Sequence, residues 1–483
     1  MMNTSAPVHT VGHKFRPAEP ESASDVSAPP SQGILMGRTT TTFLLLATAL
    51  MLSACDRSFT DVSEATVVVI SPDVRIALSE NVIDLELQVT AARDVTQVRT
   101  GGVDFSQVTN SNRWLATLPL QKGLNQFIIK SMVDDGPMGL DTVNVFYLTH
   151  SFESATAARI IPFVTGGHTT TLLPNGTLIL LGGSAQPGGA GAFDAYEWGV
   201  GRTRFAPTPG ITFFDRIGHS ASLLPDGRIL VAGGASFGDI SSVSELVEQV
   251  EIFDPTTGTF APIPSRGEPI RRMYHTAVLR HIGTEVYIVL FGGRGDTQYG
   301  SNPRLDIRRD MRTFQLRNDT LIALSPAVGP FIEFMAGHTQ SALSVEASGR
   351  AERFLIAGIK FGATLDAASL TIDFGGLAGI DIAATTTMNT ARLRHSSVTL
   401  AQGLVAHFNG RGEFIDDVFQ GGELFVEEAG VYFSFPDDLA TQLTAAYGQS
   451  ATLMPDGRVI LIGGFDETGA GLSVVEFVSL GVQ

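Results

Sequence analysis

Alternating hydrophobic and polar positions predict β-strands over residues 64–149. Residues 82–90 carry apolar side chains at every odd position from Ile83 to Val89, with polar side chains between them. Such alternation is typical of a strand that buries one face. Further β-branched and aromatic runs follow up to residue 149, separated by turn residues. The pattern therefore predicts a small, strand-rich domain with little helix.

A different pattern recurs from residue 167 onward. Its clearest copy has Gly167 and His168, an apolar strand, a Pro-Asn-Gly turn, a second apolar strand and two glycines. Close copies start at Gly218 and Gly448, and three weaker copies lie between them. The residues at the histidine position are 51, 56, 63, 57 and 54 residues apart, and they are His168, His219, His275, His338, His395 and Gln449. The chain therefore repeats one supersecondary unit six times.

Each copy has the chemistry of a tight hairpin. Proline fixes φ in the turn, the Asn or Asp side chain caps it, and glycine tolerates a positive φ. The second strand is apolar on both faces, so it must be covered on both sides. A glycine pair then lets the backbone pack closely at the end of that strand. These glycines are Gly182, Gly183, Gly233, Gly234, Gly292, Gly293, Gly463 and Gly464.

Repeats of about 50 residues that end in two glycines resemble kelch repeats. The resemblance implies a six-bladed kelch-type β-propeller over residues 158–483. The last copy is one strand short, and the strand-like segment 158–163 is expected to complete it and close the ring. Closure would remove the exposed sheet edges that promote aggregation.

The segment before the repeats resembles bacterial immunoglobulin-like modules between Trp114 and Tyr147. About seven short strands in this length fit such a sandwich. The expected fold is therefore all-β: a six-bladed kelch-type β-propeller preceded by a small Ig-like β-sandwich. Asp134, Asp135 and Asp141 are weighed as calcium ligands, but turn aspartates are common, and turn residues are the preferred interpretation.

The N-terminal pattern predicts export. Arg38 precedes an uncharged, mostly apolar run over residues 39–52, which ends in Leu-Ser-Ala-Cys55. That order of segments is typical of a signal peptide, and the tetrapeptide resembles the lipobox of bacterial lipoproteins, in which the cysteine is acylated. The alternative is an uncleaved hydrophobic segment with an incidental cysteine. Asp56 favours the inner membrane in enterobacterial lipoproteins, but other lineages sort differently, so the leaflet stays open.

These expectations divide the chain further. Residues 1–35 are a disordered extension or a mis-assigned start, because Met36 would leave a conventional signal peptide over 36–54. Residues 55–63 form a linker, and the sandwich over 64–149 follows it. The expected location is the bacterial cell envelope, at the periplasmic face or the cell surface.

Charge and cysteine content narrow the function classes. The chain has 49 acidic residues against 32 Lys plus Arg, which gives a net charge of −17. Such a chain is repelled by nucleic-acid phosphates, so nucleic-acid binding is not expected. Cys55 is the single cysteine, so no disulfide can form within the chain.

The repeated histidines have a structural and a chemical interpretation. A ring of imidazoles would suggest a metal, but Gln449 at the sixth position is a poor ligand, so hydrogen bonding between blades is preferred. Tyr274 and His275 resemble the copper-ligand segment of galactose oxidase, itself a kelch propeller preceded by a sandwich. That family also needs a cysteine cross-linked to a tyrosine, and Cys55 is assigned to the anchor. No cofactor and no metal are therefore expected.

The expected function is binding without catalysis. Arg304, Arg308, Arg309 and Arg312 form a basic cluster that either receives an acidic partner or lies in a solvated loop. Tyr274 and His275 are further candidate interaction residues. The leading hypothesis is a membrane-anchored scaffold that uses propeller loops to bind an unknown envelope protein. A carbohydrate-binding or sugar-active protein, with a glycan as partner, is the alternative.

Overall fold

The computed structural model describes the chain from residue 65 to residue 481, with gaps. The described ranges are 65–134, 136–155, 165–185, 195–198, 206–207, 216–236, 240–296, 305–324, 336–345, 351–360, 366–374, 380–412 and 417–481. The predicted signal segment with Cys55, the segment 158–163, Asp135 and Arg304 lie outside these ranges. Within them, every helix is too short or too polar to cross a membrane.

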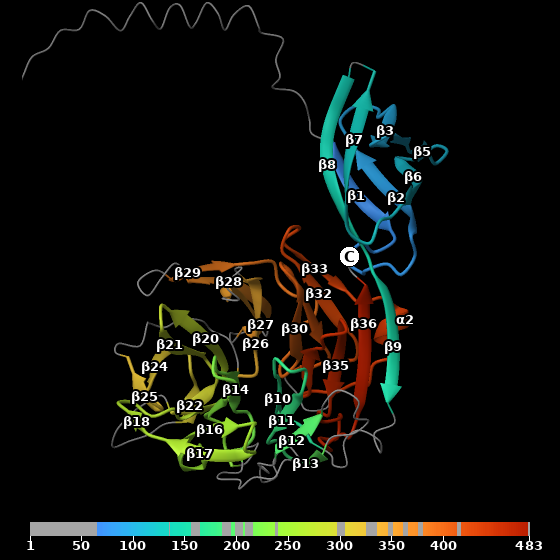
Figure 1. Ribbon diagram of the computed structural model, residues 1–483. Coiled ribbons are helices and arrows are strands. Elements are labelled where there is room, and N and C mark those ends of the chain that lie inside the picture. Colours follow the sequence, from blue (N-terminus) through green and yellow to red (C-terminus); the bar gives the residue numbers. More distant parts are fainter. Residues whose placement is uncertain are drawn as a thin grey trace, which may run out of the picture. The chain divides into compact units, whose positions relative to one another are not determined.

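Residues 66–147 form two four-stranded sheets, drawn in blue and teal in Figure 1. The first has the order β1 (Thr66–Ser71), β2 (Val82–Thr90), β6 (Arg113–Pro119) and β5 (Ser106–Gln107). The second has the order β4 (Val103–Asp104), β3 (Gln97–Thr100), β7 (Gly123–Val133) and β8 (Gly136–Tyr147). Both sheets contribute to one hydrophobic core. The odd positions of β2 are buried, as its alternation predicts.

The repeats form six antiparallel sheets within the described residues, drawn from green to red (Figure 1). The first holds β10 (Thr169–Leu172), β11 (Leu178–Leu181), β12 (Ala195–Trp198) and β13 (Ala206–Pro207). The second holds β14 (Ser220–Leu223), β15 (Ile229–Ala232), β16 (Val250–Asp254) and β17 (Thr259–Ile263). In the described ranges the helical turns are a 3₁₀ turn at Val243–Glu245 and α2 (Asp437–Ala440).

The third repeat is the most elaborate. It holds β20 (Thr276–Ile282), β21 (Glu285–Phe291), β24 (Met311–Arg317) and β25 (Thr320–Ala323), which β18 (Ser265–Arg266) extends by a parallel pairing. Beside it, β19 (Arg272–Met273), β22 (Arg294–Asp296) and β23 (Leu305–Ile307) form a small separate sheet.

The last three sheets follow the same order. The fourth holds β26 (Thr339–Val345), β27 (Ala351–Lys360), β28 (Asp366–Phe374) and β29 (Ile380–Ala384). The fifth holds β30 (Ser396–Ala401), β31 (Leu404–Phe408), β32 (Gly422–Val426) and β33 (Val431–Ser434). The sixth holds β34 (Ser450–Leu453), β35 (Arg458–Ile462), β36 (Val475–Gly481) and β9 (Thr149–Ala155).

The prediction of the closing strand is wrong in one respect. A strand that precedes the first repeat does complete the last sheet, but it is β9, which pairs with β36 from Val475 opposite Ala155 to Gly481 opposite Thr149. The segment 158–163 has an apolar run that is typical of a strand, but β9 occupies the edge of β36. Phe152 of β9 lies opposite Val478 and packs against a core shared by the fifth and sixth sheets.

Hydrophobic packing links each of the six sheets to the next. Every residue of β11 and β15 is buried, as expected for strands that are covered on both faces. Separate cores join the first sheet to the second, the second to the third, and so on to the sixth, and a further core joins the sixth to the first. The first strands of successive sheets are neighbours, and β34 is a neighbour of β10. The six sheets therefore form a closed succession.

Candidate functional site

Six backbone hydrogen bonds form a closed circle where the six first strands begin. The residues in it each directly precede a repeat histidine or Gln449, and they are Gly167, Gly218, Tyr274, Gly337, Arg394 and Gly448. We call them the axial ring. Each N–H donates to the carbonyl of the ring residue in the previous repeat, and Gly167 donates to Gly448, at N···O distances of 2.7–3.0 Å. Every ring residue has a positive φ, between 47° and 93°.

A second circle is formed by side chains. His219 Nε2 lies 3.0 Å from the hydroxyl of Thr169 in the previous repeat, and His275 Nε2 lies 3.0 Å from that of Ser220. The same contact joins His338 to Thr276, His395 to Thr339, and His168 to Ser450, at 3.1, 2.7 and 2.9 Å. Gln449 takes the same place, since its Nε2 donates to Ser396 at 3.2 Å. The histidine position therefore links each sheet to its neighbour.

One glycine pair, Gly233 and Gly234, shows why these positions exclude larger residues. A Cβ on Gly233 would lie 2.6 Å from Cε1 of His275 in the next repeat. A Cβ on Gly234 would lie 3.0 Å from Cβ of His219 in its own repeat. Both glycines also have positive φ. The first glycine therefore makes room for the next histidine and the second for its own.

The fifth and sixth repeats depart from this rule together. Asn409 stands in the place of the first glycine, with φ of 52°, and the next repeat has Gln449 in place of histidine. Asn409 Nδ2 donates to Gln449 Oε1 at 3.1 Å and to the carbonyl of Thr444 at 2.8 Å. Asn409, which is larger than glycine, is thus accommodated by the flexible side chain of Gln449 in the next repeat.

Burial disfavours the charged form of four of the repeat histidines. It lowers the pKa of His168 to about 4. It also lowers the pKa of His219, His275 and His395 well below the usual value, and nearby arginines or histidines lower it further. Neutral imidazoles that share a hydroxyl hydrogen bond are consistent with a structural role.

Buried carboxylates anchor the segments that lead into the ring. Arg216 pairs with Glu251, and Arg392 Nη2 lies 2.7 Å from Glu423 Oε1, with all four side chains almost fully buried. Arg392 also donates to the carbonyl of Asn409 at 2.7 Å. Each of these arginines stands three residues before a repeat histidine. The ion pairs therefore fix the backbone that carries ring residues.

Two ring residues break the glycine pattern. Tyr274 and Arg394 hold φ of 52° and 47°, a region that is costly for residues with a side chain. The guanidinium carbon of Arg394 lies 4.0 Å from the centroid of the Tyr274 ring, which is a close cation–π contact. The ring and the residues that follow it line a cavity of about 140 Å³. This axial cavity is the candidate functional site.

An apolar cluster adjoins the axial cavity. It contains Ile217, Met273, Tyr447 and Phe465, with Tyr274 packed against it. The Tyr447 side chain is fully buried, and its hydroxyl has no hydrogen-bond partner among the described residues. Burial raises the pKa of Tyr447, whereas the charge of Arg394 opposes that rise. Tyr447 is thus a buried phenol within the electrostatic influence of the ring arginine.

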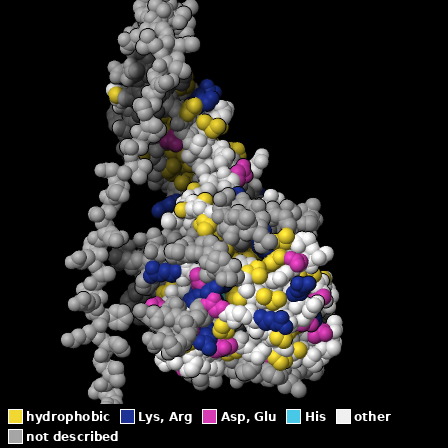
Figure 2. Space-filling view, turned by 90° about the vertical axis from the view of Figure 1, so that its left-hand side faces the viewer, with side chains coloured by type: hydrophobic (Ala, Val, Ile, Leu, Met, Phe, Trp, Pro, Cys, Tyr) yellow, Lys and Arg dark blue, Asp and Glu magenta, His cyan; other side chains and the backbone are white. Residues whose placement is uncertain are grey.

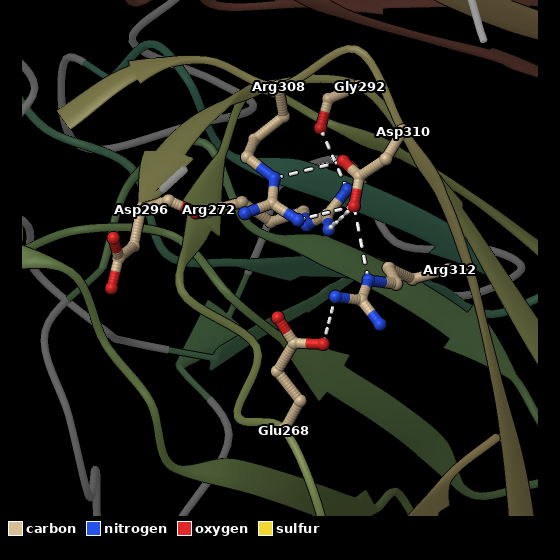
Figure 3. Close-up of polar contacts among 7 residues, drawn as sticks. All are labelled: Glu268, Arg272, Gly292, Asp296, Arg308, Asp310 and Arg312. Carbon is tan, nitrogen blue, oxygen red and sulfur yellow. Dashed lines mark hydrogen bonds and ion pairs between the residues drawn. The ribbon is translucent and has the colours of Figure 1, made fainter. Parts of the chain in front are cut away.

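The predicted basic cluster is not an open surface. Figure 3 shows Arg272, Arg308 and Arg312 converging on Asp310. Arg308 is buried and also donates to the carbonyl of Asp296, and Arg312 pairs with Glu268. Burial opposes ionisation of Asp310, but the arginines outweigh it and lower the pKa of that carboxyl.

Both interpretations of the cluster are therefore wrong for Arg308 and Arg312, which hold internal structure. Arg309 is exposed, and Arg304 lies outside the described ranges. On the face in Figure 2, basic and acidic side chains of described residues lie beside one another among apolar ones.

The copper-like arrangement finds no geometric support. Tyr274 stacks on Arg394, and His275 Nε2 is engaged with Ser220. In the parts of the chain that the structure describes, no three His, Cys, Asp or Glu residues come together as a metal site. Asp134 and Asp141 are among the described residues that form no such group.

Sequence reasoning named Tyr274 but missed Arg394 and Tyr447. Arg394 had a detectable signal, because it replaces glycine directly before a repeat histidine. Tyr447 had none, since its burial and the lack of a partner depend on the packing of several repeats.

Comparisons with known proteins agree with the fold and go no further. No protein-family model matches the chain. No curated protein matches it. The chain is similar to the solved structure of YjhT, with a TM-score of 0.50 and 12% identity, over 67% of this chain and 99% of that one. YjhT is of the β-propeller type, so the likeness supports an all-β, propeller-like fold.

Proposed function

We propose that the chain is a lipid-anchored binding protein of the bacterial envelope, with a six-bladed kelch-type β-propeller that binds at its axial ring and is preceded by an Ig-like sandwich. Support for six blades comes from the six sheets, their six shared cores and the two hydrogen-bonded circles. Support for the anchor comes from the order of segments that ends at Cys55.

The observation that carries the binding role is the strain at Tyr274 and Arg394. Four ring positions hold glycine, which adopts a positive φ without strain. A side chain there costs on the order of 1 kcal/mol, and strain of this kind concentrates at functional sites. The two side chains also stack on each other beside a cavity. Glycine would relieve this backbone strain at both positions, so the two side chains that stand there instead favour a role in binding.

The test replaces the two side chains with the residue that the other repeats use. Full-length chain, purified from native membranes with Tyr274→Gly or Arg394→Gly, should stay folded and lose its co-purifying partner. Asn318→Gly is the matched control, because Asn318 is an exposed residue with φ of 48° in the turn between β24 and β25. An unchanged set of co-purifying molecules in both ring variants would overturn the proposal. Binding on a glycan array that depends on the ring would instead favour the carbohydrate alternative.

The anchor has its own test. Cys55→Ser should abolish metabolic labelling with palmitate and release the protein from membranes. Labelling that persists in this variant would disprove acylation at Cys55. The result does not depend on the outcome for the axial ring.

A further inference from the structure

We propose that the axial cavity binds the oxyanion group of a ligand, a carboxylate or a phosphate, against Arg394. The inference rests on the proposed binding role and names the chemistry that the site would recognise. It is carried by the charge of the cavity lining and by the position of the Arg394 guanidinium over Tyr274.

Arg394 is the one Arg, Lys, Asp or Glu residue in the described lining of the cavity. The lining residues are the axial ring and the residue that follows each ring position, so Arg394 is accompanied by glycines, Tyr274, histidines and Gln449. Burial keeps His168, His219, His275 and His395 neutral. No ion pair joins Arg394 to a carboxylate among the described residues. In a chain with a net charge of −17, a cation left without a carboxylate at a cavity is suited to an anion.

Stacking leaves the donors of Arg394 available. The guanidinium carbon lies over the Tyr274 ring, 4.0 Å from its centroid, and among the described residues the Arg394 side chain donates no hydrogen bond. The N–H bonds lie in the guanidinium plane, where they form the fork that matches the two oxygens of a carboxylate or phosphate. A cavity of 140 Å³ exceeds the roughly 30 Å³ that one water molecule takes up, and it accommodates a small oxyanion.

Within the described part of the chain, Tyr447 contributes an unpartnered hydroxyl to the same region. Buried hydroxyl groups almost always have a hydrogen-bond partner, whereas the Tyr447 hydroxyl has none among the described residues. Arg394 and Arg411 both act electrostatically on it, and the guanidinium of Arg411 lies 5.2 Å from its ring centroid. Tyr447 does not line the cavity itself, so its phenol would act on a bound anion only through the neighbouring Arg394.

The test measures binding of sodium acetate, inorganic phosphate and acetamide to the full-length chain by calorimetry and thermal unfolding at constant ionic strength. Acetamide has the shape of acetate without its charge. We expect acetate or phosphate to bind with a Kd of about 0.1–10 mM, a range that suits such small ligands. Acetamide should bind at least tenfold more weakly. The tighter of the two anions identifies the group.

Variants locate the site. Arg394→Gln should weaken anion binding at least tenfold, whereas Tyr447→Phe, at a residue outside the lining, should weaken it by less than about twofold. Arg353→Gln is the control, because Arg353 is an exposed arginine paired with Glu427. Arg394→Gly serves as a second variant if Arg394→Gln fails to fold, since glycine is the usual ring residue.

Equal binding of acetate and acetamide, or unchanged anion binding in a folded Arg394 variant, would overturn the inference. Absence of binding by both anions would overturn it as well. If a partner is still lost from the glycine variants in that case, the proposed binding role stands and only the oxyanion chemistry fails.

Discussion

At the scale of single residues, the histidine position decides how neighbouring sheets are joined. Histidine and glutamine both offer a nitrogen to the hydroxyl of the previous repeat, and only histidine titrates. The two residues therefore make similar hydrogen bonds but respond differently to acid.

His168→Gln tests this difference. The pKa of His168 is about 4 when folded and near 6.5 when unfolded, so the unfolded chain binds more protons between those values. The contribution to stability is complete above pH 6.5 and is lost as the pH falls toward 4. Between pH 8 and pH 5 the native chain should lose about 2 kcal/mol more than His168→Gln. Urea unfolding at the two pH values measures this, and His168→Ala should be less stable at both.

The pairing of Asn409 with Gln449 makes a second residue-scale prediction. Gln449→His alone should be destabilising, because the new imidazole would press on the side chain at 409, where other repeats have glycine. Asn409→Gly added to it should restore part of the loss. A double-mutant cycle should give a coupling of roughly 1–2 kcal/mol. Additive effects of the two substitutions would contradict the proposed compensation.

At the scale of elements, buried ion pairs hold the connections that enter the ring. Glu423 on β32 accepts from Arg392 and from the backbone N–H groups of Asn389 and Thr390, at 2.7–3.0 Å. It thus ties the connection after β29 to the fifth sheet.

Glu423→Gln should therefore cost about 3–5 kcal/mol, because Arg392 would stay buried without its counter-charge. Arg353→Gln, which breaks the more exposed pair with Glu427, should cost less than about 1 kcal/mol. Chemical denaturation of both variants measures the difference. Equal costs would show that burial does not strengthen the dependence on the partner.

At the scale of the whole molecule, β9 is a strand from before the repeats that completes the last sheet. Phe152→Asp should loosen β9, lower stability by about 2 kcal/mol and expose the edge of β36, which promotes association. Unfolding and size-exclusion chromatography measure the two effects. Ser154→Asp is the control, because Ser154 is an exposed residue of the same strand. A monomeric, fully stable Phe152→Asp chain would show that closure does not depend on this strand.

The sequence by itself determined the all-β class, the number of repeats, their turns and the strands that are covered on both faces. These depend on local patterns, since alternation, Pro-Asx-Gly turns and glycine pairs act within one repeat. The sequence also marked Tyr274 and the histidines, because they recur or depart at a fixed position.

Only the tertiary structure decided which strand closes the last sheet, that Arg308 and Arg312 turn inward onto Asp310, and that Arg394 meets Tyr274. Each depends on residues from distant parts of the chain. Strand-like composition cannot select β9 over the segment 158–163, because partner edges decide the pairing. A cluster of arginines in the sequence likewise predicts an exposed surface, because the sequence does not show which carboxylates lie beside it in the fold.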